Sequence, residues 1–572
     1  MMKAACVLLL GFSFAVAFDT AKYKVPDTNI AAPANALYVA LNGKDTNAGT
    51  KAAPLRTPLA AVKKVANGGT IVVRAGVYYD VALGSPNKKF NLQAYPHEQV
   101  YFLGSVRVTA WTKEKTYWKA AFTNTLPNVT CPKEVISAAY PTACHPEQVF
   151  VNGAPLAQVA ALSQVTAGKF YQPTGGKWVY IGTDPTSKVV EVTKVVRGLE
   201  LLPGAAGSFI GGIGFAHYGC PWGDYSAAVI SNAENVTISQ CLFTQNSARG
   251  LSIDRPKQIV RSSIFSFNGV AGINGNRCHG STITRCIFTR NNNLRFATRN
   301  CGAYCTIGAV KIAHAQNVRV DFNSFVDNFS VGLWFDLGCT DAIVTRNRIV
   351  GNQGSGVFYE VSARAIIASN ILWKNTEYGV KLAGSDHVRI YNNDFAFSPK
   401  YQLGLLEDLR IACNKFDAYS CKMKLTWDTT NTIIRNNLFS NGQDLSFLVF
   451  GSAQVNAFQF IEAMDHNGWY RANSSIRPLV HWCNTTDKQW DQFKTHTDFM
   501  KARNMDWAPP SIGVRDTPTN PFFVNEAAGN FNLIPKSVAR GAGTPLPADI
   551  AAALGVPTSP VDMGAINWYG KA

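Results

Sequence analysis

Two acidic residues end a pair of similar segments near the middle of this 572-residue chain. Residues 332–336 read Gly-Leu-Trp-Phe-Asp and residues 356–360 read Gly-Val-Phe-Tyr-Glu, so Asp336 and Glu360 occupy the same place in the two segments. Side chains alternate along a β-strand, and if the bulky apolar residues face inward, both acids face outward. On adjacent strands their carboxyl groups would lie roughly 5 Å apart. That separation fits a retaining glycosidase, in which one acid attacks the anomeric carbon and the other protonates the leaving oxygen.

The same pair has two simpler interpretations. The acids could line a solvated face, or they could bind a calcium ion together. Stacked carboxylates repel each other unless something uses or neutralises them. The repulsion would also raise the pKa of one of them, as a general acid requires. We therefore take Asp336 and Glu360 as the candidate catalytic residues and expect no metal ligands.

Four further side chains are candidates for substrate binding. Strand alternation places Trp334 and Phe358 outward beside the acids, where a sugar ring could pack on them; coverage by a loop at residues 292–306 is the alternative. Lys311, one coil before the first acid, is expected to join the same outward column. It could stabilise an ionised nucleophile, hold a substrate hydroxyl, or form only a surface salt bridge. Lys381, outward on the following coil, is a weaker candidate of the same kind.

The elements that must position these residues repeat from Phe209 to Asn441 with a period of roughly 22–24 residues. A glycine recurs as Gly250, Gly272, Gly308, Gly332, Gly356 and Gly379, and only the interval from Gly272 to Gly308 is longer than this period. Two further columns run through Cys241, Ser263, Cys286, Asn323, Asn347 and Asn370, and through Asn246, Asn268, Asn291, Asn328, Asn352 and Asn375. The segments between columns are short and rich in β-branched or aromatic residues, which favours strands over helices. The pattern predicts a β-solenoid with inward asparagine ladders at its bends.

The ladders have consequences for cysteines and glycans. Because a side chain inside a turn is inaccessible, we expect Cys241 and Cys286 to be free thiols and the Asn328 sequon to be unused. The other cysteines allow local disulfides, with Cys131–Cys144, Cys301–Cys305 and Cys413–Cys421 as the close spacings. The cysteine pattern contains no paired CxxC motif of the zinc type, and no cofactor is expected.

Residues 1–17 combine Lys3, a short apolar run and small residues before Phe18, which predicts a cleavable secretory signal and a secreted chain. No later stretch is long and apolar enough for a membrane helix. The net charge of +17 could attract uronate polymers, or could serve only solubility. A nucleic-acid partner is not expected, because the chain carries no motif of that kind. The oligomeric state is open.

Residues 38–78, with Tyr-Val-Ala-Leu-Asn-Gly-Lys-Asp at their start and Gly-Thr-Ile-Val-Val-Arg-Ala-Gly-Val-Tyr at their end, resemble the N-terminal segment of bacterial right-handed parallel β-helix enzymes. Turn-bounded strands between residues 105 and 196 predict an antiparallel insert, a layout similar to that of the parallel β-helix β-xylosidases. In that family an Asp and a Glu on neighbouring coils are nucleophile and acid/base. The resemblance implies these roles for Asp336 and Glu360 respectively.

The expected fold is therefore all-β, a right-handed parallel β-helix with a small antiparallel β-sandwich-like insert. The expected units are a signal at 1–17, a cap and first coils at 18–104, the insert at 105–196, the main β-helix at 197–450, and final coils with a cap at 451–572.

Three functions stay open from the sequence. The first is a retaining glycoside hydrolase acting on a wall polysaccharide or oligosaccharide. The second is a polysaccharide lyase or uronate epimerase with Lys311 as base and the carboxylates holding calcium, although hard cations usually gather more oxygen ligands. The third is a non-catalytic wall-binding solenoid.

Overall fold

The computed structural model describes residues 18–223, 226–298, 307–413, 417–442, 445–449, 455–473, 478–484, 489–503 and 511–565. The predicted secretory signal, at residues 1–17, and the Cys301–Cys305 spacing lie outside these ranges. In the described ranges, no helix is long and apolar enough to cross a membrane.

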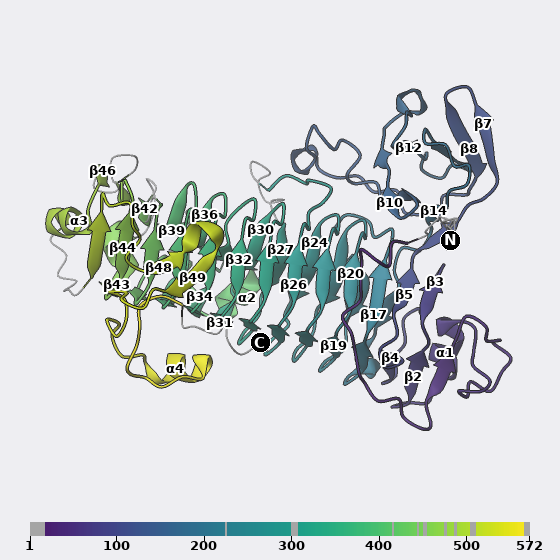
Figure 1. The fold of residues 1–572 in the computed structure, drawn as a ribbon, viewed down its shortest axis with the longest axis horizontal. Helices are drawn as coiled ribbons and strands as arrows, with labels where there is room; N and C mark the ends of the chain where they lie inside the picture. Colours follow the sequence, from purple (N-terminus) through teal and green to yellow (C-terminus); the bar gives the residue numbers. More distant parts are fainter. Residues whose placement is uncertain are drawn as a thin grey trace, which may run out of the picture.

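Successive coils contribute strands to three long, almost entirely parallel sheets, which lie side by side along the molecule (Figure 1). Sheet 1 contains β1 (Leu37–Val39), β2 (Thr70–Val73), β4 (Asn91–Ala94), β16 (Phe209–Gly211), β19 (Thr237–Ser239), β22 (Ile259–Arg261), β25 (Thr282–Thr284), β28 (Arg319–Asp321), β31 (Thr340–Thr345), β34 (Ala363–Ala368), β37 (Asp386–Tyr391), β40 (Thr432–Arg435) and β43 (Ile461–Asp465). Sheet 2 contains β3 (Gly76–Tyr78), β5 (Val100–Leu103), β17 (Ile213–Ala216), β20 (Leu242–Thr244), β23 (Ile264–Ser266), β26 (Ile287–Thr289), β29 (Ser324–Val326), β32 (Arg348–Val350), β35 (Ile371–Trp373), β38 (Asp394–Ala396), β41 (Leu438–Ser440), β44 (Gly468–Arg471) and β47 (Ile512–Arg515).

Sheet 3 carries the candidate site. Its strands are β15 (Leu199–Leu201), β18 (Ala227–Ser231), β21 (Arg249–Ile253), β24 (Ala271–Asn276), β27 (Gly308–Ala313), β30 (Val331–Asp336), β33 (Val357–Glu360), β36 (Tyr378–Ala383), β39 (Tyr401–Leu406), β42 (Leu445–Val449), β45 (Val480–Asn484) and β46 (Gln489–Phe493). Only β46 runs antiparallel to its neighbour in the described part of this sheet. Hydrogen bonds between residues one coil apart in the sequence therefore hold each sheet together.

The bends between sheets are the predicted asparagine ladders. Between sheets 1 and 2, the amide of Asn323 donates to Oδ1 of Asn347 at 3.0 Å, and Asn347 donates to Asn370 at 3.0 Å. The second ladder, between sheets 2 and 3, includes Asn328, which donates to Asn352 at 2.9 Å and is fully buried. Cys241 and Cys286 are buried free thiols, as predicted. The asparagine side chains satisfy buried backbone groups that a sharp turn would otherwise leave unpaired.

The glycine column is corrected at one position. Gly308 pairs with Val331, whereas the register of Val310 with Ile273 and Leu333 places Ala309 in the column. The core side chains set the register here, so a glycine one position earlier in the strand does not mark the column. The long step across the lengthened loop therefore runs from Gly272 to Ala309.

Residues 105–193 form a mainly antiparallel unit that projects from the N-terminal end of the β-helix (Figure 1). One sheet contains β10 (Ala154–Pro155), β9 (Val149–Val151), β14 (Val190–Thr193) and β6 (Ser105–Arg107). The other contains β11 (Ala157–Gln158), β12 (Lys169–Tyr171), β13 (Trp178–Ile181), β8 (Tyr117–Ala121) and β7 (Trp111–Glu114). Apolar residues of both sheets share a small core. The division of the whole chain at the expected domain boundaries stays a proposal.

Short helices cover the ends and sides. The α-helices are α1 (Pro58–Lys64), α2 (Ala418–Lys422), α3 (His496–Arg503) and α4 (Ala548–Leu554). The 3-10 helices are η1 (Lys133–Val135), η2 (Leu162–Gln164), η3 (Pro203–Ala205), η5 (Ala457–Phe460) and η6 (Glu526–Ala528). Helix α1 is capped by Thr57, whose side chain accepts from the amide of Ala60. After the last coils, the hairpin of β48 (Phe523–Asn525) and β49 (Asn530–Leu533) and then α4 run back along the outside of the β-helix (Figure 1).

Candidate functional site

Asp336 and Glu360 end two adjacent strands of sheet 3. Strands β30 and β33 pair Leu333 with Val357 and Phe335 with Tyr359. These four residues are fully buried within the coil, so the alternate side chains face outward. The two acids follow directly after the paired Phe335 and Tyr359, one coil apart on the same outer face. The roughly 5 Å separation of their carboxyl groups stays a prediction from the strand spacing.

A continuous stack of side chains runs across four strands beside the acids. The register aligns Lys311 with Trp334, Trp334 with Phe358, and Phe358 with Lys381. The Trp334 and Phe358 rings stack with their centroids 5.1 Å apart. The Lys311 ammonium lies 3.9 Å from the Trp334 centroid and the Lys381 ammonium 4.1 Å from the Phe358 centroid. The structure therefore brings all four expected neighbours together in one row.

This row alters the expected use of the aromatic rings. Each ring has one face on the other ring and one face on an ammonium, and Trp334 and Phe358 are only 6% and 8% exposed. A sugar could therefore reach them only at their edges. The stack holds both rings in one orientation, which suits a role in positioning the neighbouring acids. Direct substrate contact by these residues stays a prediction.

Lys311 lies in a different column from the one expected. Ala313, not Lys311, is aligned with Asp336, and the lysine reaches the acid along the strand. Its Nζ lies 2.8 Å from Oδ2 of Asp336, and both side chains are less than one-tenth exposed. The backbone N–H of Leu337 donates to Oδ1 at 2.8 Å. A cation and a backbone N–H donor thus contact the two oxygens of this carboxyl group.

Glu360 has a different environment. The indole Nε1 of Trp334 donates to its Oε2 at 3.0 Å, and Arg410 forms an ion pair with its Oε1. Burial, followed by the charge of Asp336, raises the pKa of Glu360 to about 7, while Arg410 and the two lysines oppose the rise. A carboxylic acid with this pKa can hold a proton near neutral pH and release it, as general acid/base catalysis requires.

Arg410 was not found from the sequence. It belongs to the connection between β39 and β40, and Asp408 holds it in a bidentate pair with contacts of 2.7 and 2.8 Å. A sequence signal for this connection does exist, because the first ladder continues from Asn393 to Asn437, a step of 44 residues that is almost two coils long. Nothing in the spacing, however, indicates where the extra residues fold.

A disulfide and apolar packing hold the connection between β39 and β40 against the end of the candidate site. A disulfide joins Cys413 to Cys421 on α2. Ala412 and Trp427 pack with Val361, the residue after Glu360, in a small apolar cluster. These contacts place the arginine over the acid from outside the β-helix.

Of the two lysines in the row, Lys381 differs from Lys311 in its contacts with acidic groups. Within the described part of the chain, its ammonium has the Phe358 ring as a contact and no ion pair. Burial lowers the pKa of Lys381 from its ordinary value, against the opposing effect of Glu360. This ammonium is therefore available to a ligand group placed beside the acid pair.

Metal ligands are not clustered at the site. Among the described residues, no group of three or more His, Cys, Asp or Glu side chains could hold a metal ion. Each of the two acids instead has a cationic side chain as its direct partner.

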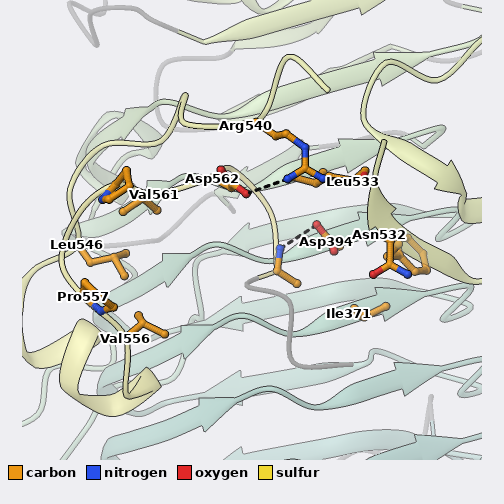
Figure 2. A pocket seen from close by; sticks show the side chains of 13 residues that line it. Ile371, Asp394, Asn532, Leu533, Arg540, Leu546, Val556, Pro557, Val561 and Asp562 are labelled. Atoms are coloured by element: carbon orange, nitrogen blue, oxygen red, sulfur yellow. Dashed lines mark hydrogen bonds and ion pairs between the residues drawn. The ribbon is translucent and has the colours of Figure 1, made fainter. Parts of the chain in front are cut away.

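A separate hollow of about 400 Å³ lies between the C-terminal segment and sheet 2 (Figure 2). Its lining is largely apolar, and its polar members include Arg540 paired with Asp562 and the fully buried Asp394. Asp394 accepts the backbone N–H of Ala565, and burial raises its pKa well above the ordinary value. None of the candidate residues from the sequence lies in this hollow.

Comparison with known proteins gives the fold. Residues 226–395 match a protein-family model described as a right handed beta helix region. The structure of XylC in complex with xylose is similar, with 15% sequence identity and a TM-score of 0.60, over 85% of this chain and 87% of that chain. These findings confirm the right-handed parallel β-helix and the resemblance to proteins of that fold.

Other similarities are weaker or shorter. Pectate lyase Pel9A is 12% identical with a TM-score of 0.35, over 95% of this chain and 98% of that one. The A-module of mannuronan C-5 epimerase AlgE4 from Azotobacter vinelandii is 12% identical with a TM-score of 0.39, over 70% and 85%. The uncharacterized protein YwoF of Bacillus subtilis (strain 168) is 38% identical over 72 residues. That match spans 12% of this chain and 15% of the relative.

Proposed function

We propose that this protein is a carbohydrate-active enzyme, a retaining glycoside hydrolase that acts on a polysaccharide or oligosaccharide outside the cell. The observation that carries the proposal is the unequal environment of two stacked acids. Asp336 is ion-paired with Lys311 and accepts a backbone N–H, while burial and the neighbouring charge raise the pKa of Glu360 to about 7. One group is thus suited to attack and the other to carry a proton.

In the proposed first step, Asp336 attacks the anomeric carbon while Glu360 gives its proton to the leaving oxygen. The bond to the leaving group breaks and a glycosyl ester forms on Asp336. In the second step, Glu360 takes a proton from water, and that water releases the sugar and restores the Asp336 carboxylate. Lys311 would stabilise the carboxylate before attack and after release.

The comparisons add support of a general kind. The similar β-helix structure XylC was solved with xylose bound. Its low sequence identity leaves the sugar, the linkage and the position of cleavage to experiment.

The test is a panel of neutral and acidic glycans, followed for new reducing ends and for absorbance of unsaturated uronates. Proton NMR of the first product then distinguishes retention from inversion. New reducing ends with the anomer retained are expected. Inversion at the anomeric carbon, or unsaturated products, would overturn the proposal.

A lyase or epimerase is the second candidate, and one observation bears on it. Lys311, the base expected for that chemistry, is engaged in an ion pair with Asp336. Lys381, whose pKa burial lowers, is the better base in this structure. Elimination that survives Lys311→Ala and is lost in Lys381→Ala would favour this candidate.

We also propose that the chain is secreted. The proposal rests on the signal-like residues 1–17 and on the disulfides Cys131–Cys144 and Cys413–Cys421. A non-catalytic wall-binding role is disfavoured because it gives no use to the paired acids.

A further inference from the structure

Another buried acid lies away from the candidate site, where the antiparallel insert meets the β-helix. Glu191 of β14 is fully buried. Its Oε1 accepts from the hydroxyl of Tyr79 at 3.0 Å, and its Oε2 lies 3.4 Å from the Ser105 hydroxyl and 3.1 Å from Nδ1 of His217. The acid therefore joins residues from the insert and from the first coils.

The fourth contact comes from the start of the described chain. The backbone nitrogen of Phe18 donates to Oε1 of Glu191 at 3.2 Å. The Phe18 ring is 1% exposed and packs against Tyr101 and His217. The position of Phe18 is thus determined by both its ring and its nitrogen.

Burial raises the pKa of Glu191, but the contacts with His217, Tyr79 and the Phe18 nitrogen outweigh it and hold that pKa below its ordinary value. A buried carboxylate is costly unless an opposite charge or several strong donors compensate it. Tyr79 and Ser105 supply neutral donors, and Arg107 reaches only the Tyr79 hydroxyl, at 3.1 Å. His217 also faces Gln245, whose Oε1 lies 3.2 Å from its Nε2.

We propose that removal of the predicted signal, residues 1–17, releases an α-ammonium group at Phe18 that forms a buried ion pair with Glu191. In the cleavage, a signal-peptidase-type protease adds water across the peptide bond, which leaves a carboxylate on Ala17 and an ammonium on Phe18. The amide N–H now at Glu191 is replaced by a cation with three donors. The contact changes from a hydrogen bond donated by a neutral amide to an ion pair between two charged groups.

The ion pair between the Phe18 ammonium and Glu191 would form only in the processed chain. The segment after Phe18 lies on the outer face of sheet 2, where Tyr23 and Val25 pack with Tyr101 and Leu103. Farther along, Gln240 donates to the backbone oxygen of Asp27. The ion pair would anchor this segment at its first residue and join it to the insert through Glu191.

The first test is the N-terminus itself. The full-length chain is expressed in a secreting host, and the exported protein is examined by N-terminal sequencing and intact mass. A mature chain that begins at Phe18 is expected. A chain that begins at any other residue would overturn the proposal.

The second test measures the ion pair. A chain released from a fusion with a free Phe18 is compared with one that carries Gly-Ser before Phe18, each with Glu191 or with Glu191→Gln. The extension should lower the unfolding temperature by several degrees with Glu191 and have little effect with Glu191→Gln. Glu147→Gln is the matched control, because Glu147 is a buried acid of the same insert that contacts Asn124 and Gln158. The effect of the extension should persist in that variant.

Because Glu191→Gln could fail to fold, a chemical readout is included. A water-soluble acylating reagent is applied near neutral pH, and modification of the N-terminal amine is followed by mass spectrometry. The Phe18 amine should react at least about tenfold more slowly than the amine of the extended chain. Equal rates, or equal unfolding temperatures for the two chains, would contradict the ion pair.

Discussion

The indole N–H of Trp334 donates to the carboxylate of Glu360 on the next coil, at 3.0 Å. The tryptophan is itself held between Lys311 and Phe358. The hydrogen bond therefore connects the stacked row to the acid with the raised pKa, and it fixes the orientation of that acid relative to Asp336.

Trp334→Phe tests this relationship, because it keeps a ring in the stack and removes only the donor. We expect kcat to fall about tenfold, the rate equivalent of a hydrogen bond worth about 1.4 kcal/mol, with little change in KM. Trp373→Phe is the control, since the buried Nε1 of Trp373 has no hydrogen-bond partner among the residues that the structure describes. An equal loss in both variants would assign the effect to packing.

The two acids should respond differently to removal. In Glu360→Ala, substrates with poor leaving groups should lose roughly 100- to 10,000-fold in rate, while activated aryl glycosides still form the glycosyl-enzyme and azide rescues its breakdown. In Asp336→Ala, turnover of both substrate types should be lost, because no covalent intermediate can form. Steady-state kinetics with both substrate types make the measurement. Activity retained in Asp336→Ala would remove this residue from the nucleophile's role.

The pH profile should follow Glu360. A general acid must be protonated, so kcat/KM is expected to be high below the pKa of about 7 and to fall as the pH rises through it. Arg410→Ala removes a cation that stabilises the carboxylate, so the falling limb should move to higher pH. Arg364→Ala is a matched control, because both arginine side chains are 46% exposed and ion-paired, and Arg364 pairs with Asp341 instead. An unchanged limb in Arg410→Ala would refute the assigned coupling.

Lys311 should matter for stability as well as rate. Lys311→Met leaves the Asp336 carboxylate buried without its cation, which costs about 3–5 kcal/mol for a buried pair. Adding Asp336→Asn removes the uncompensated charge, so the double variant should recover much of the lost stability. Thermal unfolding of the two single variants and the double variant gives the interaction energy. Additive losses would mean that the pair contributes no coupling.

The asparagine ladder should carry measurable stability. Asn347 donates to Val320 and Asn370 and accepts from the backbone and side chain of Asn323, at 2.9 to 3.0 Å. Asn347→Ala leaves several of these buried groups unpaired and should lower the free energy of unfolding by about 3 kcal/mol or more. Asn42→Ala, on an exposed residue, is the control and should have almost no effect. Calorimetry or denaturant unfolding would show the difference.

The sequence by itself determined the coil and the outward direction of the acids. Each coil is bonded to the next through residues one repeat apart, so columns such as Asn323, Asn347 and Asn370 appear directly in the spacing. Strand alternation then places Asp336 and Glu360 on one face, because the apolar residues next to them occupy the core side of each strand.

Only the tertiary structure decided which cations meet the two acids. Lys311 reaches Asp336 from a neighbouring column because its long side chain extends along the strand. Arg410 meets Glu360 across 50 residues through a connection whose path depends on packing around Trp427 and on the Cys413–Cys421 disulfide. Likewise, Phe18 and Glu191 are 173 residues apart. Such contacts follow no repeat, since loop paths are determined by the surfaces on which they pack rather than by a ladder of equivalent hydrogen bonds.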